Sequence, residues 1–216
     1  AGRAVGARLV KTDGEPKVTG TDRFGADALP DTAWLTLRAV RSPHAHARFR
    51  IGALAGLHAR FPGLVAVLTA GDVPGQNRFG IYPTGKDQPV FAEGMVRMRG
   101  EPVCALVGDA ETIAAIRDED VPVAWEPLLP VSFEDALADD AQALHDHAPG
   151  NVLCRGRVVC GDAEAALTAA PHRAEIAVET GFVEHAYIEP EAGYARRVGD
   201  RIEIVACTQT PYMDRD

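Results

Sequence analysis

Two pairs of histidines are spaced as metal ligands often are. His44 and His46 form one pair, and His145 and His147 form the other. Alternate side chains of an extended segment point to the same face, so each pair places two imidazoles side by side. Neither pair has a third ligand nearby in the sequence, and a proline close to each pair predicts a loop or strand end. We therefore interpret all four as solvated loop histidines and expect no metal ligands.

Three further residues have the types needed for acid–base chemistry. Glu189 and Glu191 share a strand face, as the paired carboxylates of glycosidases do, and His185 lies four residues before Glu189. This arrangement would suit a small acid–base hydrolase. The interpretation we favour is that these polar groups fix a strand crossover through hydrogen bonds. Glu184 and Arg196 are most simply solvated.

The cysteines do not have the spacing of a metal centre. They stand at Cys104, Cys154, Cys160 and Cys207, so no C-x-x-C motif occurs and zinc ribbons and iron–sulfur clusters are not indicated. Cys104 and Cys207 lie in apolar runs, where cysteine acts as a small hydrophobic residue. The motifs G-x-S-x-G, H-E-x-x-H and G-x-x-x-x-G-K-[ST] are also absent.

The composition excludes several classes of protein. Of 216 residues, 46% are hydrophobic and 25% charged, which is typical of a globular chain rather than a disordered one. The net charge of −9 argues against a nucleic-acid binder. The sequence contains no stretch of 18 or more apolar residues, so we expect no membrane span, and we expect no signal peptide because no charged-then-apolar segment opens this sequence. We expect a cytoplasmic protein.

The elements of the first part of the chain alternate between strands and helices. Alternating or continuous apolar residues predict strands, and residues 64–68 resemble a buried one. Residues 71–94 are rich in proline and glycine and predict a long functional or docked loop. The whole pattern indicates an α+β domain, with strands at 34–40, 64–68, 96–99, 103–107 and 121–125 and helices at 53–61 and 109–117.

The second part of the chain follows a polar connector. Residues 133–150 carry several aspartates and form the best domain boundary. A short helix should begin near Gly161, and Gly199-Asp200 predicts a hairpin turn. Three strands are expected, at 172–183, 187–198 and 201–208, and a helix should begin after Pro211. At the other end, 13–16 and 19–21 are turn-forming sequences of an N-terminal arm.

Five segments together resemble one enzyme family, and they occur in that family's order. They are residues 13–20 (DGEPKVTG), 41–48 (RSPHAHAR), 87–103 (DQPV…GEPV), 182–190 (FVEHAYIEP) and 208–211 (TQTP). They resemble the molybdenum-cofactor (large) subunit of the xanthine dehydrogenase and aldehyde oxidase family. The resemblance covers nearly all of the chain.

The resemblance implies a fold and a domain organisation. The fold would be α+β, an α/β hammerhead domain followed by the first strands of a molybdopterin-binding domain. The expected boundaries are an N-terminal arm at 1–19, the hammerhead domain at 20–134, a connector at 135–157 and an incomplete molybdopterin-binding domain at 158–216.

The resemblance also implies a reaction and its cofactors. Such enzymes hydroxylate an aldehyde or a heteroaromatic carbon with oxygen from water. Molybdopterin carries the molybdenum, and electrons leave through 2Fe-2S clusters to FAD in other domains or subunits. The expected partners are therefore the remainder of the molybdenum subunit, the iron–sulfur and FAD parts and a small-molecule substrate, without nucleic acid.

Gln209 is the one residue to which the resemblance gives a direct catalytic and cofactor-binding role. Its side-chain amide would hydrogen-bond the apical ligand of molybdenum. A neutral amide offers N–H donors without a charge that would compete as a ligand. The alternative is a turn glutamine that caps nearby backbone groups.

The resemblance also implies that other parts of the family's active site lie after Asp216. The glycine-rich cofactor segment and the catalytic glutamate of the family both come later than Gln209. We therefore expect the N-terminal portion of a molybdenum hydroxylase, inactive and without bound cofactor on its own. The alternative is a non-catalytic hammerhead chain of a split subunit, which docks onto the partner that carries the active site.

Overall fold

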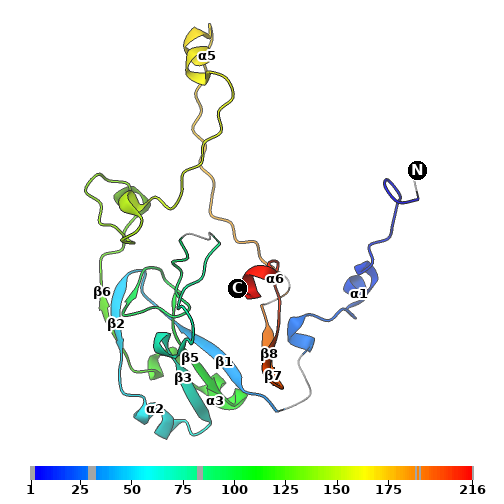
Figure 1. The fold of residues 1–216 in the computed structure, drawn as a ribbon, viewed down its shortest axis with the longest axis vertical. Coiled ribbons are helices and arrows are strands. Elements are labelled where there is room, and N and C mark those ends of the chain that lie inside the picture. Colours follow the sequence, from blue (N-terminus) through cyan, green and yellow to red (C-terminus); the bar gives the residue numbers. More distant parts are fainter. Residues whose placement is uncertain (1–2, 29–32, 82–84, 188, 190, 216) are drawn as a thin grey trace. The chain divides into compact units, whose positions relative to one another are not determined.

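The computed structural model describes residues 3–28, 33–81, 85–187, 189 and 191–215 (Figure 1). The chain divides into two compact units. One consists of residues 33–174, and the other combines residues 1–32 with 175–216.

The unit of residues 33–174 contains two antiparallel three-stranded sheets. In the first sheet, β5 (Pro102–Gly108) lies between β1 (Thr36–Arg41) and β3 (Leu64–Leu68). In the second, β2 (Ala47–Ile51) lies between β4 (Met95–Val96) and β6 (Val123–Pro127). The central position of β5 agrees with its continuous apolar sequence, since such strands are buried on both faces.

Short helices occur along the same unit. They are α2 (Ala55–Arg60), α3 (Ala110–Ala115), α4 (Phe133–Ala136) and α5 (Ala163–Ala169), with 3₁₀ turns at Ala70–Asp72, Asp118–Asp120 and Pro149–Asn151. Asp109 starts α3, because its carboxylate accepts a hydrogen bond from the Thr112 backbone N–H at 2.8 Å. Asp162 caps α5 in the same way.

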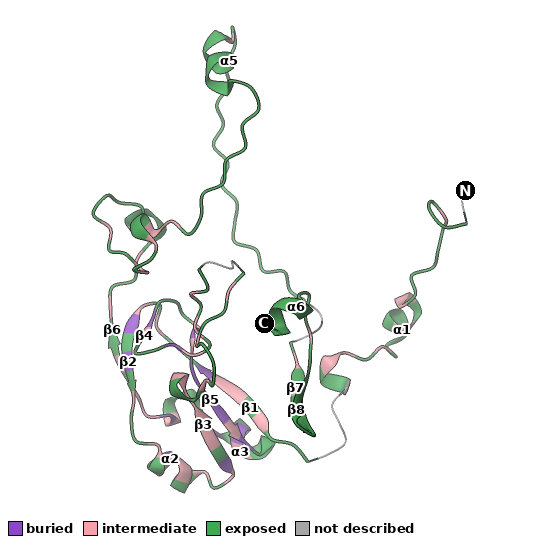
Figure 2. Ribbon diagram, viewed as in Figure 1, coloured by how far each residue is buried: buried purple, intermediate pink, exposed green. Residues whose placement is uncertain are grey.

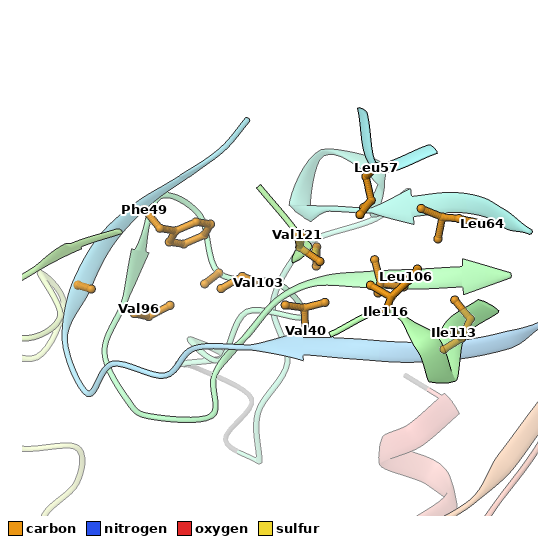
Figure 3. Packing of buried hydrophobic residues seen from close by; sticks show 13 residues of the cluster. Val40, Phe49, Leu57, Leu64, Val96, Val103, Leu106, Ile113, Ile116 and Val121 are labelled. Atoms are coloured by element: carbon orange, nitrogen blue, oxygen red, sulfur yellow. The ribbon is translucent and has the colours of Figure 1, made fainter. Parts of the chain in front are cut away.

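The hydrophobic core of this unit is built around β5. Leu106, Cys104 and Val103 on this strand are at most 1% exposed, and Val40 on β1 packs in the same cluster. Figure 3 shows Ile113 of α3 pointing into this cluster beside Leu106. Buried residues are most frequent on β5 and also occur on β1, β2, β3 and β4 and on α2 and α3 of this unit (Figure 2).

The second unit contains a two-stranded hairpin and short helices. Its elements are α1 (Gly14–Thr19), a 3₁₀ turn at Gly25–Ala28, β7 (Gly193–Val198), β8 (Arg201–Ala206) and α6 (Pro211–Arg215). Val198 pairs with Arg201, so the hairpin loop has two residues, Gly199 and Asp200. Gly199 has φ 63°, a conformation that glycine adopts at low cost.

Most of the elements expected from the sequence are present. The strands near 34–40, 64–68, 103–107 and 121–125 form, as do both predicted helices, the hairpin turn and the helix after Pro211. Residues 71–94 contain a short 3₁₀ turn and one bridge between Phe79 and Gln88, and are otherwise irregular in the described ranges. The α+β fold class is therefore confirmed.

Some of the expected elements were wrong. Residues 172–183 form no strand, and the strand expected at 187–198 begins only at Gly193. An alternating segment becomes a strand only when a neighbouring backbone completes its hydrogen bonds, and no described segment pairs with 172–183. Residues 13–16 begin a helix, α1, rather than a simple turn. Strand β3 lies at a sheet edge with Val65 60% exposed, so it is not buried throughout.

Candidate functional site

Gln209 lies between strand β8 and helix α6. The strand ends at Ala206 and the helix begins at Pro211. Proline suits the first position of a helix, because a backbone N–H there would have no hydrogen-bond partner within the helix. The hairpin pairing of β8 with β7 and the helical turn on the other side both restrict the backbone around Gln209. The side chain is therefore displayed from a short segment with ordered structure on both sides.

The turn around Gln209 is closed by its neighbour rather than by Gln209 itself. The Thr210 backbone N–H donates to Thr208 Oγ1 at 2.9 Å. Gln209 is exposed, and within the described residues its amide has no hydrogen-bond partner. The role of a backbone cap, which the sequence left open for Gln209, is filled by Thr208.

Glu189 is an exposed carboxylate of the same unit that links two distant segments. Its Oε1 accepts a hydrogen bond from the Gly25 backbone N–H at 3.0 Å and one from Cys207 Sγ at 3.3 Å. A Cβ on Gly25 would lie 2.6 Å from Cys207 Sγ, so the contact requires glycine. Glu189 thus joins segments far apart in the sequence, as expected for a structural carboxylate.

The other groups of the acid–base hypothesis are engaged elsewhere or exposed. His185 stacks on Tyr187 with ring centroids 5.6 Å apart. Glu191 is exposed. Arg196 and Glu184, which were expected to be solvated, are exposed as well, although Arg196 pairs with Glu203 and Glu184 accepts from the His185 backbone N–H at 3.0 Å. The described contacts do not combine His185 and Glu189 into a proton-transfer pair.

Two of the segments that resemble the family lie against each other. The Ser42 backbone N–H donates to the Glu101 carbonyl, and the Gly100 N–H donates to the Ser42 carbonyl, both at 2.9 Å. Buried Glu101 accepts from the Arg97 backbone N–H at 2.7 Å, and Ser42 Oγ bonds the backbone of His44. Residues 41–48 and 100–103 are therefore hydrogen-bonded to each other beside the end of β1, and this contact has a structural role.

The first histidine pair lies within residues 41–48. His44 packs edge-on against Trp125, with ring centroids 5.3 Å apart. His46 Nδ1 lies 2.9 Å from the Leu129 carbonyl oxygen. Both rings therefore have local partners and are half-buried, unlike the solvated loop histidines expected from the sequence.

The second histidine pair has a different environment. The structure brings Asp87 to His145 and His147, so that a ligand atom from each lies within 4.8 Å of the others. No local pattern in the sequence indicates this third group, because Asp87 lies in the long loop and the histidines follow β6. Proximity of this kind arises only in the folded chain.

Cys104 is the buried thiol of the core. Burial in apolar surroundings raises the pKa of Cys104 to about 11, and the nearby Asp118 carboxylate adds to the shift. A thiol reacts and binds metals as the thiolate, so Cys104 is an inert packing residue. This confirms its interpretation as a small hydrophobic side chain.

Comparison with known protein families accounts for nearly the whole chain. Residues 19–129 match the aldehyde oxidase and xanthine dehydrogenase a/b hammerhead domain, and residues 144–216 match the molybdopterin cofactor-binding domain. The chain belongs to the aldehyde oxidase and xanthine dehydrogenase family. The family and the fold class expected from the sequence are both confirmed.

Individual relatives and structures agree with this assignment. The chain is 36% identical over 209 residues to a probable xanthine dehydrogenase subunit from Bacillus subtilis (strain 168), covering 95% of this chain and 27% of that protein. It is 30% identical to the nicotinate dehydrogenase large molybdopterin subunit of Eubacterium barkeri, covering 99% and 49%. The aldehyde oxidoreductase structure from Desulfovibrio gigas superposes with a TM-score of 0.70 at 28% identity, over 90% of this chain and 23% of that one.

These relatives are considerably longer than the part that is matched. The chain spans about a quarter of the Bacillus protein and about half of the Eubacterium one. Among the described residues, no helix combines the length and apolar character needed to cross a bilayer.

Proposed function

We propose that this chain contributes the hammerhead domain and the first cofactor-contacting turn of a molybdenum hydroxylase. The reaction class is hydroxylation of an aldehyde or heteroaromatic carbon with oxygen from water. The observation that carries the proposal is the match of residues 144–216 to the molybdopterin cofactor-binding domain, because that segment contains Gln209.

The chemistry of Gln209 fits a molybdenum cofactor. Its amide is exposed, has no hydrogen-bond partner among the described residues and offers two N–H donors without charge. The bound cofactor would supply the oxygen-transfer and two-electron chemistry. Gln209 would donate a hydrogen bond to the bound cofactor, and the Thr208 turn would hold the amide in place.

The exposure of the second unit supports further protein partners. Ile202 and Ile204 on β8 are 64% and 69% exposed, and Phe182 is fully exposed. Ile202 and Ile204 are two residues apart on β8 and so share one face, and an exposed apolar face of a strand indicates contact with other protein. We propose that the remainder of the molybdenum subunit covers them, and that 2Fe-2S and FAD groups in other domains or subunits receive the electrons.

An isotope experiment tests the reaction class. An enzyme assembled with this chain and its cofactors is given aldehydes and N-heteroaromatic substrates in H₂¹⁸O, and the products are analysed by mass spectrometry. We expect one ¹⁸O atom per hydroxylated N-heteroaromatic product and none when ¹⁸O₂ replaces labelled water. Aldehydes are tested only for the absence of label from ¹⁸O₂, because their carbonyl oxygen exchanges with water. Label from ¹⁸O₂, or product formed only by hydrolysis of esters or glycosides, would refute the proposal.

A further inference from the structure

A compact group of potential metal ligands lies outside the Gln209 region. Asp87 Oδ2 is 3.2 Å from His147 Nε2 and 3.9 Å from His145 Nδ1. Two ligands of a tetrahedral zinc ion with bonds of 2.0–2.1 Å lie about 3.4 Å apart. The distance from Asp87 to His147 is close to this value, whereas the other separations, 3.9 Å from Asp87 to His145 and up to 4.8 Å among the three ligand atoms, would shorten as one ion binds.

The loop that carries the histidines is fixed by a polar clamp. The Leu144 backbone N–H donates to Asn151 Oδ1 at 2.7 Å, and Asn151 Nδ2 donates to the Ala136 and Gln142 carbonyls, each at 3.0 Å. Arg97 Nε donates to the Leu144 carbonyl at 2.7 Å, which anchors the loop near β4. The clamp holds residues adjoining the histidine pair in defined positions, which lowers the entropy cost of binding an ion there.

The loop that carries Asp87 is fixed independently. Gln88 and Phe79 exchange backbone hydrogen bonds at 2.8 and 3.2 Å, next to Asp87 in the sequence. Asn77 bonds both the N–H and the carbonyl of Phe91, at 3.1 and 2.8 Å. Two separately anchored loops thus present the three side chains to one another.

The ligand set indicates the type of ion. Two imidazole nitrogens and one carboxylate oxygen match the preferences of Zn²⁺ and its neighbours among the transition metals. Mg²⁺ and Ca²⁺ prefer sites built from oxygen ligands. Asp87, His145 and His147 are 23%, 35% and 51% exposed, so water can complete the coordination.

We propose that Asp87, His145 and His147 bind one divalent transition-metal ion, with Zn²⁺ as the best match. The ion would join the loop of residues 71–94 to the segment after β6. The site is separate from the molybdenum chemistry proposed for Gln209 and does not depend on it. It departs from the expectation of no metal ligand that the sequence alone suggested.

The test uses the 216-residue chain without an affinity tag, after treatment with a chelator. Zn²⁺ is titrated into the wild type, Asp87→Asn, His147→Ala and the control His172→Ala, which removes an exposed histidine outside the group. Calorimetry should give one Zn²⁺ per wild-type chain and per control chain, with affinity at least about tenfold lower in Asp87→Asn and His147→Ala.

Imidazole resonances in ¹H–¹⁵N spectra provide a second measurement that does not depend on the variants' folding. On addition of Zn²⁺ to the wild type, the His145 and His147 ring signals should shift at one equivalent, while the His172 signal stays in place. The proposal is overturned if these rings do not respond, if His172 responds equally, or if Asp87→Asn binds as tightly as the wild type. In those cases the contacts are an imidazole–carboxylate pair without an ion.

Discussion

The chemistry of this chain depends on how single side chains are paired. Glu189 has the residue type of a catalytic acid but accepts hydrogen bonds from Gly25 and Cys207, so it acts as a structural carboxylate. Gln209 has the opposite character, since its amide has no partner among the described residues. We therefore propose that this segment of the chain contacts the cofactor through the neutral amide of Gln209 rather than through the carboxylate of Glu189.

The cysteines give a prediction at the residue scale. Cys104 is fully buried with its pKa raised to about 11 from 9.0, whereas Cys160 is exposed. The shift alone reduces the thiolate population of Cys104 about 100-fold near neutral pH. Iodoacetamide should therefore label Cys160 rapidly and Cys104 at least about 100-fold more slowly, as followed by peptide mass spectrometry.

The denatured chain supplies the control for this labelling experiment. In guanidinium chloride both cysteines should be labelled at similar rates, because burial is lost. Equal labelling in the native chain would contradict the placement of Cys104 in the core.

At the scale of strands and helices, the first sheet depends on a close approach of two backbone segments. A Cβ added to Gly108, at the end of β5, would lie 2.5 Å from the Gly63 carbonyl oxygen, just before β3. Central strand β5 holds both β1 and β3, so its position determines the first sheet. Glycine at position 108 is required by this contact and not by an unusual φ angle.

A matched pair of glycine substitutions tests this packing. Gly108→Ala should lower the free energy of unfolding, because the backbone of β3 must move to relieve the clash. Gly56→Ala lies in α2, where no atom is within 4 Å of the new Cβ, and should stabilise the chain by about 0.5–1 kcal/mol. Chemical denaturation followed by circular dichroism measures both, and equal stability of the two variants would contradict the proposed packing at Gly108.

Local sequence signals were sufficient to predict many elements. Asp109 predicted the start of α3, and Gly199-Asp200 predicted the hairpin, since caps and turns depend on neighbouring residues. Residues 172–183 were predicted as a strand from apolar alternation, but a strand also needs a partner backbone. That requirement belongs to tertiary structure and leaves no mark in the segment itself.

At the scale of the whole molecule, the two units differ in what supports them. Residues 33–174 contain the buried cluster of Val40, Val103 and Leu106, whereas the strands of the other unit have no buried residue. The chain spans about a quarter and about half of two relatives, and we propose that further protein covers these strands in the assembled enzyme.

One candidate site could be located from the sequence and the other could not. The position of Gln209 was predicted from the T-Q-T-P segment, and its role stays a prediction. The grouping of Asp87 with His145 and His147 could not be predicted, because no sequence rule relates the long loop to the segment after β6. Tertiary structure supplied that grouping.

The central claim is that Gln209 supports the molybdenum cofactor. It is tested most directly in a cofactor-loaded enzyme containing this chain, with Gln209→Ala compared with wild type and with Gln76→Ala, an exposed glutamine in the long loop. Turnover per molybdenum and the electron paramagnetic resonance spectrum of the reduced metal are measured together. We predict that Gln209→Ala lowers turnover about 10- to 100-fold at equal molybdenum content and alters the spectrum, while Gln76→Ala changes neither. Unchanged turnover and an unchanged spectrum in Gln209→Ala would contradict the claim.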